Sequence, residues 1–184
     1  ATKAMPKELL LIVDKPLIQF AAEEAVASGI DTLIFVTGRN KRAIEDHFDR
    51  NKELELALIK TGKVEQAKMV ANILPKGIEC IFVRQPEQLG LGHAVLCAER
   101  VVGNEPFAVL LADDFIVNDE IPTLANMITA YYNSKKSQIS VIEVQGAEIS
   151  NYGVVEKSIS SGKITGIVEK PIESEAPSNL ASIG

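Results

Sequence analysis

Two kinds of hydrophobic pattern alternate along most of the chain. Apolar runs rich in β-branched and aromatic residues, typical of strands buried in a parallel sheet, occur at 32–37, 79–84, 107–112 and 138–144. Segments with apolar residues near helical spacing occur at 17–28, 41–48, 54–74, 92–102 and 123–134. This alternation predicts an α/β fold: a Rossmann-like, doubly wound, mostly parallel or mixed sheet flanked by helices.

The alternation stops near the C-terminal end of the chain. Two short strand-like pieces, 153–156 and 163–168, flank Ser160, Ser161 and Gly162, and this pattern predicts a β-hairpin at the edge of a small second lobe. No repeat, low-complexity tract or linker interrupts the sequence. We therefore expect residues 1–184 to form a single catalytic domain.

Core and surface positions follow from the same patterns. Phe35, Phe82 and Phe107 lie inside apolar runs and are expected in the core, whereas His47 lies in a charged helical segment and is expected on the surface. Cys80 and Cys97 are the only cysteines and form no CxxC pair. Their number and spacing predict neither a disulfide framework nor a zinc site.

Charge and hydropathy exclude several classes of partner. The formal net charge is −6 and no lysine- or arginine-rich tract is present, which argues against a nucleic-acid backbone as the main partner. The longest apolar run, 9–13, is too short to span a bilayer, and no secretory leader opens the sequence. We therefore expect no membrane partner and a cytoplasmic protein whose anionic ligands need local cations.

The first candidate ligand site follows the second predicted strand, because open α/β sheets bind ligands beyond the carboxyl ends of their strands. Gln85 stands at that end, and Gly90 and Gly92 allow the backbone to approach a base or a phosphate where a helix begins. A glycine turn that only packs a helix is an equal alternative. A dinucleotide-binding fingerprint is also open, although Val95 stands where its third glycine belongs.

Two further candidates carry charge. Asp113 and Asp114 follow the third predicted strand, where a carboxylate could hold Mg²⁺ against phosphate oxygens or could instead cap a turn. Lys170, held extended by the proline after it, and Lys7, which follows a proline, are point charges suited to phosphate. Exposed lysines are often only solvated, so neither lysine decides the function alone.

Several motifs occur in a characteristic order along nearly the whole chain: PKELL, VDKPLIQF, RQPEQLGLGHAVLCA, LLADDF, NYGVVE, GIVEKP and APSNLASIG. In this order they resemble the motifs of the bacterial-type UTP:glucose-1-phosphate uridylyltransferases, a branch of the sugar-nucleotide pyrophosphorylases. The family's Gly-rich loop and its C-terminal part have no counterpart in this stretch, so we expect these residues alone to be inactive.

The resemblance assigns roles on the nucleotide side. It implies that Lys7 contacts the nucleotide phosphates and takes part in catalysis, and that Asp113 is the Mg²⁺ ligand. It also implies that Gln85 and Gly90 bind the uracil base. A glutamine amide can form paired hydrogen bonds with uracil or with thymine, so thymidylyl transfer is the near alternative.

The resemblance also assigns roles on the sugar side. It implies that the Gly153 backbone and the Glu169 carboxylate bind the sugar, and that Lys170 binds the sugar phosphate and assists catalysis. Asp114 and His93 lie beside implied site residues and have a secondary rank. The implied reaction converts UTP and glucose 1-phosphate to UDP-glucose and pyrophosphate in a homo-oligomeric enzyme. A noncatalytic homologue that binds nucleotide sugar is the alternative of a different class.

Overall fold

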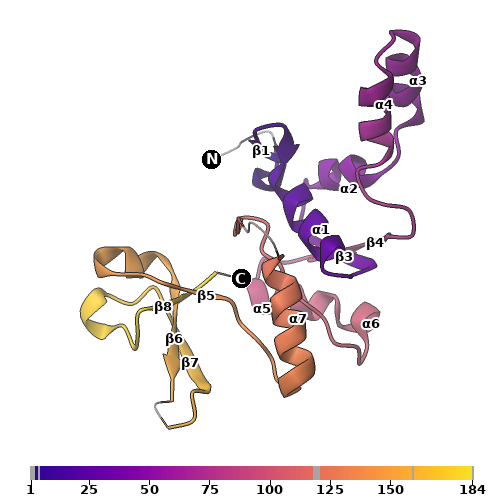
Figure 1. The fold of residues 1–184 in the computed structure, drawn as a ribbon. Coiled ribbons are helices and arrows are strands. Elements are labelled where there is room, and N and C mark those ends of the chain that lie inside the picture. Colours follow the sequence, from indigo (N-terminus) through magenta and orange to yellow (C-terminus); the bar gives the residue numbers. More distant parts are fainter. Residues whose placement is uncertain (1–2, 4, 118–120, 159, 184) are drawn as a thin grey trace. The chain divides into compact units, whose positions relative to one another are not determined.

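The computed structural model describes residue 3, residues 5–117, residues 121–158 and residues 160–183 (Figure 1). The chain divides into two compact units, Ala1–Val117 and Asn118–Gly184. The first unit contains all but one of the described α-helices, and the second contains a four-stranded sheet. The α/β class predicted from the sequence is confirmed.

A parallel strand pair forms the centre of the first unit. Strand β3 (Thr32–Thr37) pairs with β4 (Glu79–Arg84), in a register that runs from Thr32 opposite Glu79 to Thr37 opposite Arg84. Both strands have the bounds that the apolar runs predict. A smaller antiparallel pair, β1 (Leu11–Ile12) and β2 (Lys15–Pro16), follows the short 3-10 helix η1 (Lys7–Leu9).

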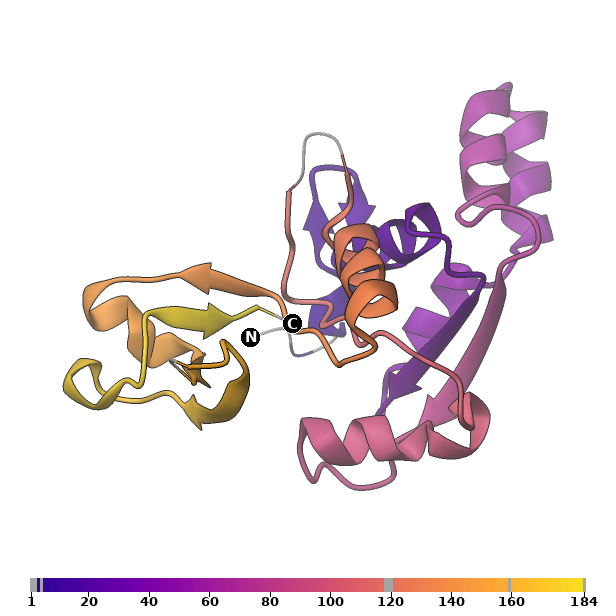
Figure 2. The ribbon, with the colours of Figure 1, turned by 60° about the horizontal axis from the view of Figure 1, so that its bottom comes forward.

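The first unit also contains the following helices. They are α1 (Leu17–Ala27), α2 (Arg42–Phe48), α3 (Lys52–Lys60), α4 (Val64–Ala71), α5 (Leu91–Cys97) and α6 (Glu99–Val102). The single helix predicted over 54–74 is wrong, because Gly62 adopts a φ of 79° and ends α3, so that α3 and α4 lie side by side as a hairpin (Figures 1 and 2). The helix predicted over 92–102 is likewise two helices, which meet at Ala98.

The core of the first unit supports two candidate site residues. Leu9, Ile18 and Ile44 form the buried cluster, and further partly buried side chains pack against it: Phe35, Phe48, Phe82 and Ala112. Leu9 follows Lys7 by two positions and Ala112 directly precedes Asp113. Packing of these two apolar residues in or against the core cluster therefore anchors both segments that carry the charged candidates.

Two predicted strands differ from the structure. Residues 107–112 form no strand ladder with any described residue, and Phe107 is 60% exposed instead of lying in the core. An apolar run favours a strand, but a strand needs a neighbour that accepts its hydrogen bonds. The run at 138–144 contains only β5 (Val141–Glu143), which pairs antiparallel with β8 (Leu180–Ser182) in the second unit and does not extend the parallel pair.

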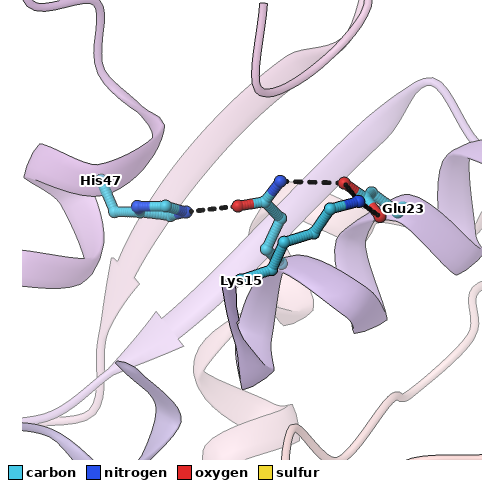
Figure 3. Close-up of polar contacts among 4 residues, drawn as sticks. Lys15, Glu23 and His47 are labelled. Carbon is cyan, nitrogen blue, oxygen red and sulfur yellow. Dashed lines mark hydrogen bonds and ion pairs between the residues drawn. The ribbon is translucent and has the colours of Figure 1, made fainter. Parts of the chain in front are cut away.

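Hydrogen bonds link four polar side chains of the first unit (Figure 3). Lys15 Nζ donates to both oxygens of Glu23 at 3.0 and 2.9 Å, and Gln19 Nε2 donates to Glu23 Oε1 at 2.8 Å. His47 Nε2 lies 3.1 Å from Gln19 Oε1 and must donate, because that oxygen only accepts. The expected surface position of His47 is wrong: the ring is half-buried, and desolvation lowers its pKa.

The second unit contains the predicted hairpin. Strands β6 (Gly153–Lys157) and β7 (Ile164–Glu169) pair antiparallel, and Gly162 turns with a φ of 67°. With β5 and β8 (Leu180–Ser182) they form one sheet in the order β5-β8-β6-β7, whose core residues Val154 and Ala181 have no exposed surface. The unit also contains α7 (Thr123–Ser134) and the 3-10 helices η2 (Gly146–Asn151) and η3 (Glu173–Glu175).

Among the described residues, every helix is too short or too polar to cross a membrane.

Candidate active site

Lys7 is presented by a short local structure at the start of the first unit. Pro6, with a φ of −54°, begins the 3-10 turn, in which Leu9 N–H donates to the Pro6 carbonyl at 3.0 Å and Leu10 N–H to the Lys7 carbonyl at 3.1 Å. Leu9 is buried in the core cluster. The proline and the buried leucine therefore fix the backbone of Lys7 and leave its side chain more than half exposed.

Asp113 lies next to Lys7, although 106 residues separate them in sequence. Lys7 Nζ donates to Asp113 Oδ2 at 2.6 Å, and both side chains are more than half exposed. Asp113 stands in a turn closed by Asp114 N–H, which donates to the Leu111 carbonyl at 3.1 Å. The structure thus brings together the lysine predicted to contact phosphate and the aspartate predicted to hold the metal.

The two adjacent aspartates have different electrostatic surroundings. The hydrogen bond from Lys7 holds the pKa of Asp113 below its ordinary value and raises the pKa of Lys7. Burial, and then the Asp113 charge, raise the pKa of Asp114. Of the two carboxylates, Asp113 therefore keeps its charge to the lower pH.

A second ion pair beside this one was not predicted from the sequence. Lys41 Nζ donates to Glu8 Oε1 at 2.5 Å, across 33 positions of sequence. The Glu8 side chain is 13% exposed, and its Oε2 is buried without a hydrogen-bond partner in the described part of the chain. Glu8 stands next to Lys7 in the PKELL motif, but no feature of the sequence indicates Lys41 as its partner.

The predicted base-binding residues share one loop of the first unit. Gln85 N–H donates to the Thr37 carbonyl at 2.8 Å, so the β3–β4 ladder holds the backbone of Gln85 directly after β4. Gly90, before α5, has φ 94° and ψ 179°, a conformation that is essentially restricted to glycine. Gln85 Nε2 reaches across the loop to the Gly90 carbonyl at 3.1 Å.

The Gln85 amide offers less to a base than the sequence suggests. Its Nε2 also lies 3.1 Å from Nδ1 of His93, so the nitrogen has two partners within the protein. Only the amide oxygen remains for a ligand in this arrangement. In this arrangement Gln85 presents a single acceptor to a ligand, where the sequence suggests a paired donor and acceptor.

The predicted sugar-binding residues meet in the second unit. Gly153, the first residue of β6, lies opposite Glu169, the last residue of β7. A Cβ atom at position 153 would lie 3.1 Å from Glu169 Oε2 and 3.2 Å from Ile167 Cγ2. Because Gly153 has no side chain, the Glu169 carboxylate can lie in the space beside it.

Lys170 follows Glu169 in an unexpected conformation. Its φ is 46°, so the extended backbone expected before a proline is wrong. Proline disfavours the right-handed helical region for the preceding residue, and this chain adopts the left-handed region instead. Lys170 N–H donates to the Tyr152 carbonyl at 2.9 Å, and Ser150 Oγ donates to the Pro171 carbonyl at 2.7 Å, which holds the turn. Lys170 Nζ lies 4.0 Å from Glu169 Oε1.

Other features of the described residues do not form a second site of this kind. No group of three or more His, Cys, Asp or Glu is placed to hold a metal ion within those residues. A hollow of about 220 Å³ in the first unit is lined by none of the predicted site residues. Its lining comes from the end of α2, the end of α4 and the start of β4, and includes Phe48, Arg50 and Cys80.

Comparison with known proteins identifies relatives of the whole chain. The family model described as Nucleotidyl transferase matches residues 1–184. The chain is 48% identical over 187 residues to the UTP–glucose-1-phosphate uridylyltransferase YngB of Bacillus subtilis, and the match covers 100% of this chain and 62% of that protein. It is 47% identical over 193 residues to UTP–glucose-1-phosphate uridylyltransferase 2 of Staphylococcus saprophyticus, covering 64% of that protein.

Solved structures agree with these relatives. The chain superposes on a UDP-glucose pyrophosphorylase from Acinetobacter baumannii with a TM-score of 0.89 and 43% identity, covering 99% of this chain and 66% of that one. A UTP-bound structure of that pyrophosphorylase gives the same TM-score, identity and coverage. This chain therefore spans somewhat less than two thirds of the length of these relatives. The family match also decides against the dinucleotide-binding alternative.

Proposed function

This chain belongs to the nucleotidyl transferase family, and from that premise we propose that the whole protein transfers a uridylyl group from UTP to glucose 1-phosphate. The products are UDP-glucose and pyrophosphate. Relatives named UTP–glucose-1-phosphate uridylyltransferase, at 47% to 48% identity, support this choice of substrates. The expectations of a homo-oligomer and of a cytoplasmic location stay predictions.

The observation that carries the proposal is the pairing of Lys7 with Asp113 at 2.6 Å. The fold brings an ammonium and an ionised carboxylate, 106 positions apart, to one exposed place. An exposed pair of this kind adds little to stability, about 0 to 1 kcal/mol. Its value lies in the ligands that each partner can bind: phosphate oxygens for Lys7 and a hard cation for Asp113.

The proposed chemistry needs no protein nucleophile. An oxygen of the glucose 1-phosphate forms a bond to the α-phosphorus of UTP, while the bond from that phosphorus to the bridging oxygen breaks and its electron pair leaves with pyrophosphate. A phosphate is already ionised at neutral pH, so no general base is required. The protein must bring two anions together and neutralise the charge that builds on the transferred group.

Two lysines serve this purpose in the proposal. Lys7 neutralises the nucleotide phosphates, and Lys170 binds the phosphate of the sugar. Nζ of Lys170 lies 4.0 Å from Glu169, at a side chain that is 63% exposed, so it is accessible to an anion. The Glu169 carboxylate accepts hydrogen bonds from sugar hydroxyls. It has room to do so because Gly153, beside it, has no side chain.

Mg²⁺ is the cofactor in the proposal. This cation is usually bound by one or two carboxylates together with substrate phosphates, and Asp113 with Asp114 beside it fits such a donor set. We assign the cation to Asp113 because it is the carboxylate held beside Lys7, where the nucleotide phosphates are proposed to bind. When bound, the cation would supply further neutralisation of the phosphate charge.

Pyrophosphate release from the whole protein tests the proposal, with glucose 1-phosphate, Mg²⁺ and either UTP or dTTP. We expect metal-dependent release that favours UTP. Because each of these groups stabilises transition-state charge, Lys170→Ala and Asp113→Ala should each lower kcat by about 10²-fold to 10³-fold. Lys163→Ala, an exposed lysine outside the candidate site, is the matched control and should keep full activity.

The alternatives give other results. Release that favours dTTP would assign the protein to thymidylyl transfer, since the single acceptor of Gln85 treats uracil and thymine alike. Nucleotide-sugar binding without any release would support the noncatalytic alternative. Unchanged turnover in Lys170→Ala would remove that lysine from the mechanism.

A further inference from the structure

We infer that His93 is a positioning residue that orients the amide of Gln85 and so decides which pyrimidine edge the base site accepts. The inference deepens the proposed function, because it rests on Gln85 facing the nucleotide base. It names a determinant of the preference for UTP over CTP.

The two nitrogen contacts of Gln85 define the orientation of the amide. Nε2 lies 3.1 Å from the Gly90 carbonyl oxygen and 3.1 Å from His93 Nδ1. An amide nitrogen has two hydrogens and accepts no hydrogen bond, so both contacts are donations from Gln85. Each of its hydrogens has a partner, and the amide oxygen points to neither of them.

This arrangement also defines the tautomer of His93. Nδ1 must be the bare nitrogen that accepts from Gln85, and the ring proton must therefore lie on Nε2. If the amide were reversed, its oxygen would face the Gly90 carbonyl oxygen, and no change in the His93 tautomer could place a hydrogen between these two acceptors. The reversed amide would therefore leave polar groups unpaired.

The surrounding backbone keeps these groups in place. The Gly90 carbonyl also accepts from Ala94 N–H at 3.2 Å, so it is held by the first turn of α5. His93 lies in the same turn and is half-buried. The Gln85 backbone is held by its bond to Thr37 at the other end of the loop. Strand β4 and helix α5 thus support the amide from two sides.

Only one acceptor, Gln85 Oε1, remains for the base. Uracil presents an N3–H donor to such an acceptor, and thymine presents the same group. Cytosine presents a bare N3 at the same position, which would place two acceptors against each other. Its nearest donor, the N4 amine, is attached to the neighbouring ring carbon and would need a shifted base. A site built around one hydrogen bond rejects a ligand that leaves its polar group unpaired. The orientation set by His93 together with the Gly90 carbonyl therefore favours UTP over CTP.

The test compares His93→Leu with His93→Asn in the whole protein. Leucine fills the space without an acceptor, whereas the Oδ1 atom of asparagine can take the place of Nδ1. Calorimetric titration with UTP and with CTP gives the ratio of the two Kd values. We expect His93→Leu to reduce the preference for UTP about fivefold to tenfold, the effect of one hydrogen bond, and His93→Asn to retain it. Leu96→Ala, an exposed residue of α5, is the control.

A purely structural role of His93 predicts a different result. Loss of packing would weaken both nucleotides equally and leave their ratio unchanged, and asparagine would restore nothing. An unchanged ratio in His93→Leu therefore overturns the inference.

A second measurement does not depend on nucleotide binding. Long-range ¹H–¹⁵N spectra of His93 in the wild-type protein should show a proton on Nε2 and none on Nδ1. A proton on Nδ1 overturns the inference whatever the activity. Absence of UTP binding and of pyrophosphate release, with the expected tautomer present, would instead contradict the proposed function and leave the positioning role supported.

Discussion

The two units assemble their candidate site residues in different ways. In the first unit, Lys7 and Asp113 meet from opposite ends of the unit's sequence, and the core cluster that contains Leu9, with Ala112 packed against it, holds them there. In the second unit, Gly153 and Glu169 face each other across one antiparallel ladder, 16 positions apart by their numbering. The first arrangement needs the whole unit to fold, whereas the second needs only one hairpin in register.

The two candidate lysines are also held in different ways. The ammonium of Lys7 contacts its carboxylate partner at 2.6 Å, so a phosphate ligand must compete with Asp113 for it. Lys170 lies 4.0 Å from Glu169 and is held by a left-handed backbone instead of a close ion pair. A long-range contact thus sets the position of one lysine, and a local turn sets that of the other.

The largest expected effect tests the dependence of the first unit on its core. Ile44, which is 2% exposed, is central to the cluster that supports the Lys7 and Asp113 segments. Ile44→Ala should lower the free energy of unfolding by about 2 to 5 kcal/mol, because it removes buried methyl groups and leaves a cavity. Chemical denaturation measures the change, with Leu56→Ala, at a residue 58% exposed, as the control. Equal effects of the two substitutions would contradict the assigned core.

An intermediate effect tests the local arrangement of the second unit. In Gly153→Ala the new methyl group would displace the Glu169 carboxylate, now 3.1 Å from that position. We expect the KM for glucose 1-phosphate to rise about tenfold, the loss of roughly one hydrogen bond to the sugar. Initial-rate kinetics of the whole protein measures it.

Gly166→Ala is the matched control for that change. A Cβ atom there would also lie 3.1 Å from a carboxylate, Oε2 of Glu156, in the same hairpin but outside the candidate site. Gly153→Ala should lose at least as much stability as the control, because its Cβ atom would also lie 3.2 Å from Ile167 Cγ2, and only the change at Gly153 should alter the KM. A raised KM in both would show that the hairpin as a whole, and not the place of Glu169, determines sugar binding.

The smallest expected effect concerns pH. The hydrogen bond from Lys7 lowers the pKa of Asp113, so its contribution to stability is present above the ordinary aspartate pKa and is lost as the pH falls through the lowered one. The pair is more than half exposed, so this contribution is small. Carboxyl ¹³C titration should show Asp113 titrating below Asp114, whose pKa burial raises. Lys7→Ala should bring the Asp113 value upward, and an unchanged value would contradict the ion pair.

Much of the fold could be predicted because its signals are local. Strands β3 and β4 and helix α7 have the bounds that the hydrophobic patterns predict, and the β6–β7 hairpin forms around the predicted turn. Local patterns failed at 54–74, where the left-handed Gly62 divides two helices. They also failed at 107–112, because no property of an apolar run shows whether another strand will pair with it.

The residues of the candidate site could likewise be predicted from local motifs, whereas their long-range contacts could not. The ordered motifs indicated its residues, including Lys7, Asp113 and Lys170. Nothing in the sequence indicated which other residues they contact. The Glu8–Lys41 pair and the bond from Gln85 to His93 are contacts of this kind. The left-handed backbone of Lys170 depends on its bond to the Tyr152 carbonyl, across the hairpin.

The sequence by itself determined the α/β class, most of the helices and strands, and which residue types are available for phosphate, base and sugar. These properties depend on periodicity, turn chemistry and motif order within short stretches of chain. The tertiary structure alone decided which charges pair, which amide hydrogens are already used and which carboxylate keeps its proton more readily. Hydrogen bonds and desolvation depend on distances of a few ångströms between residues remote in sequence, and only packing of the core sets those distances.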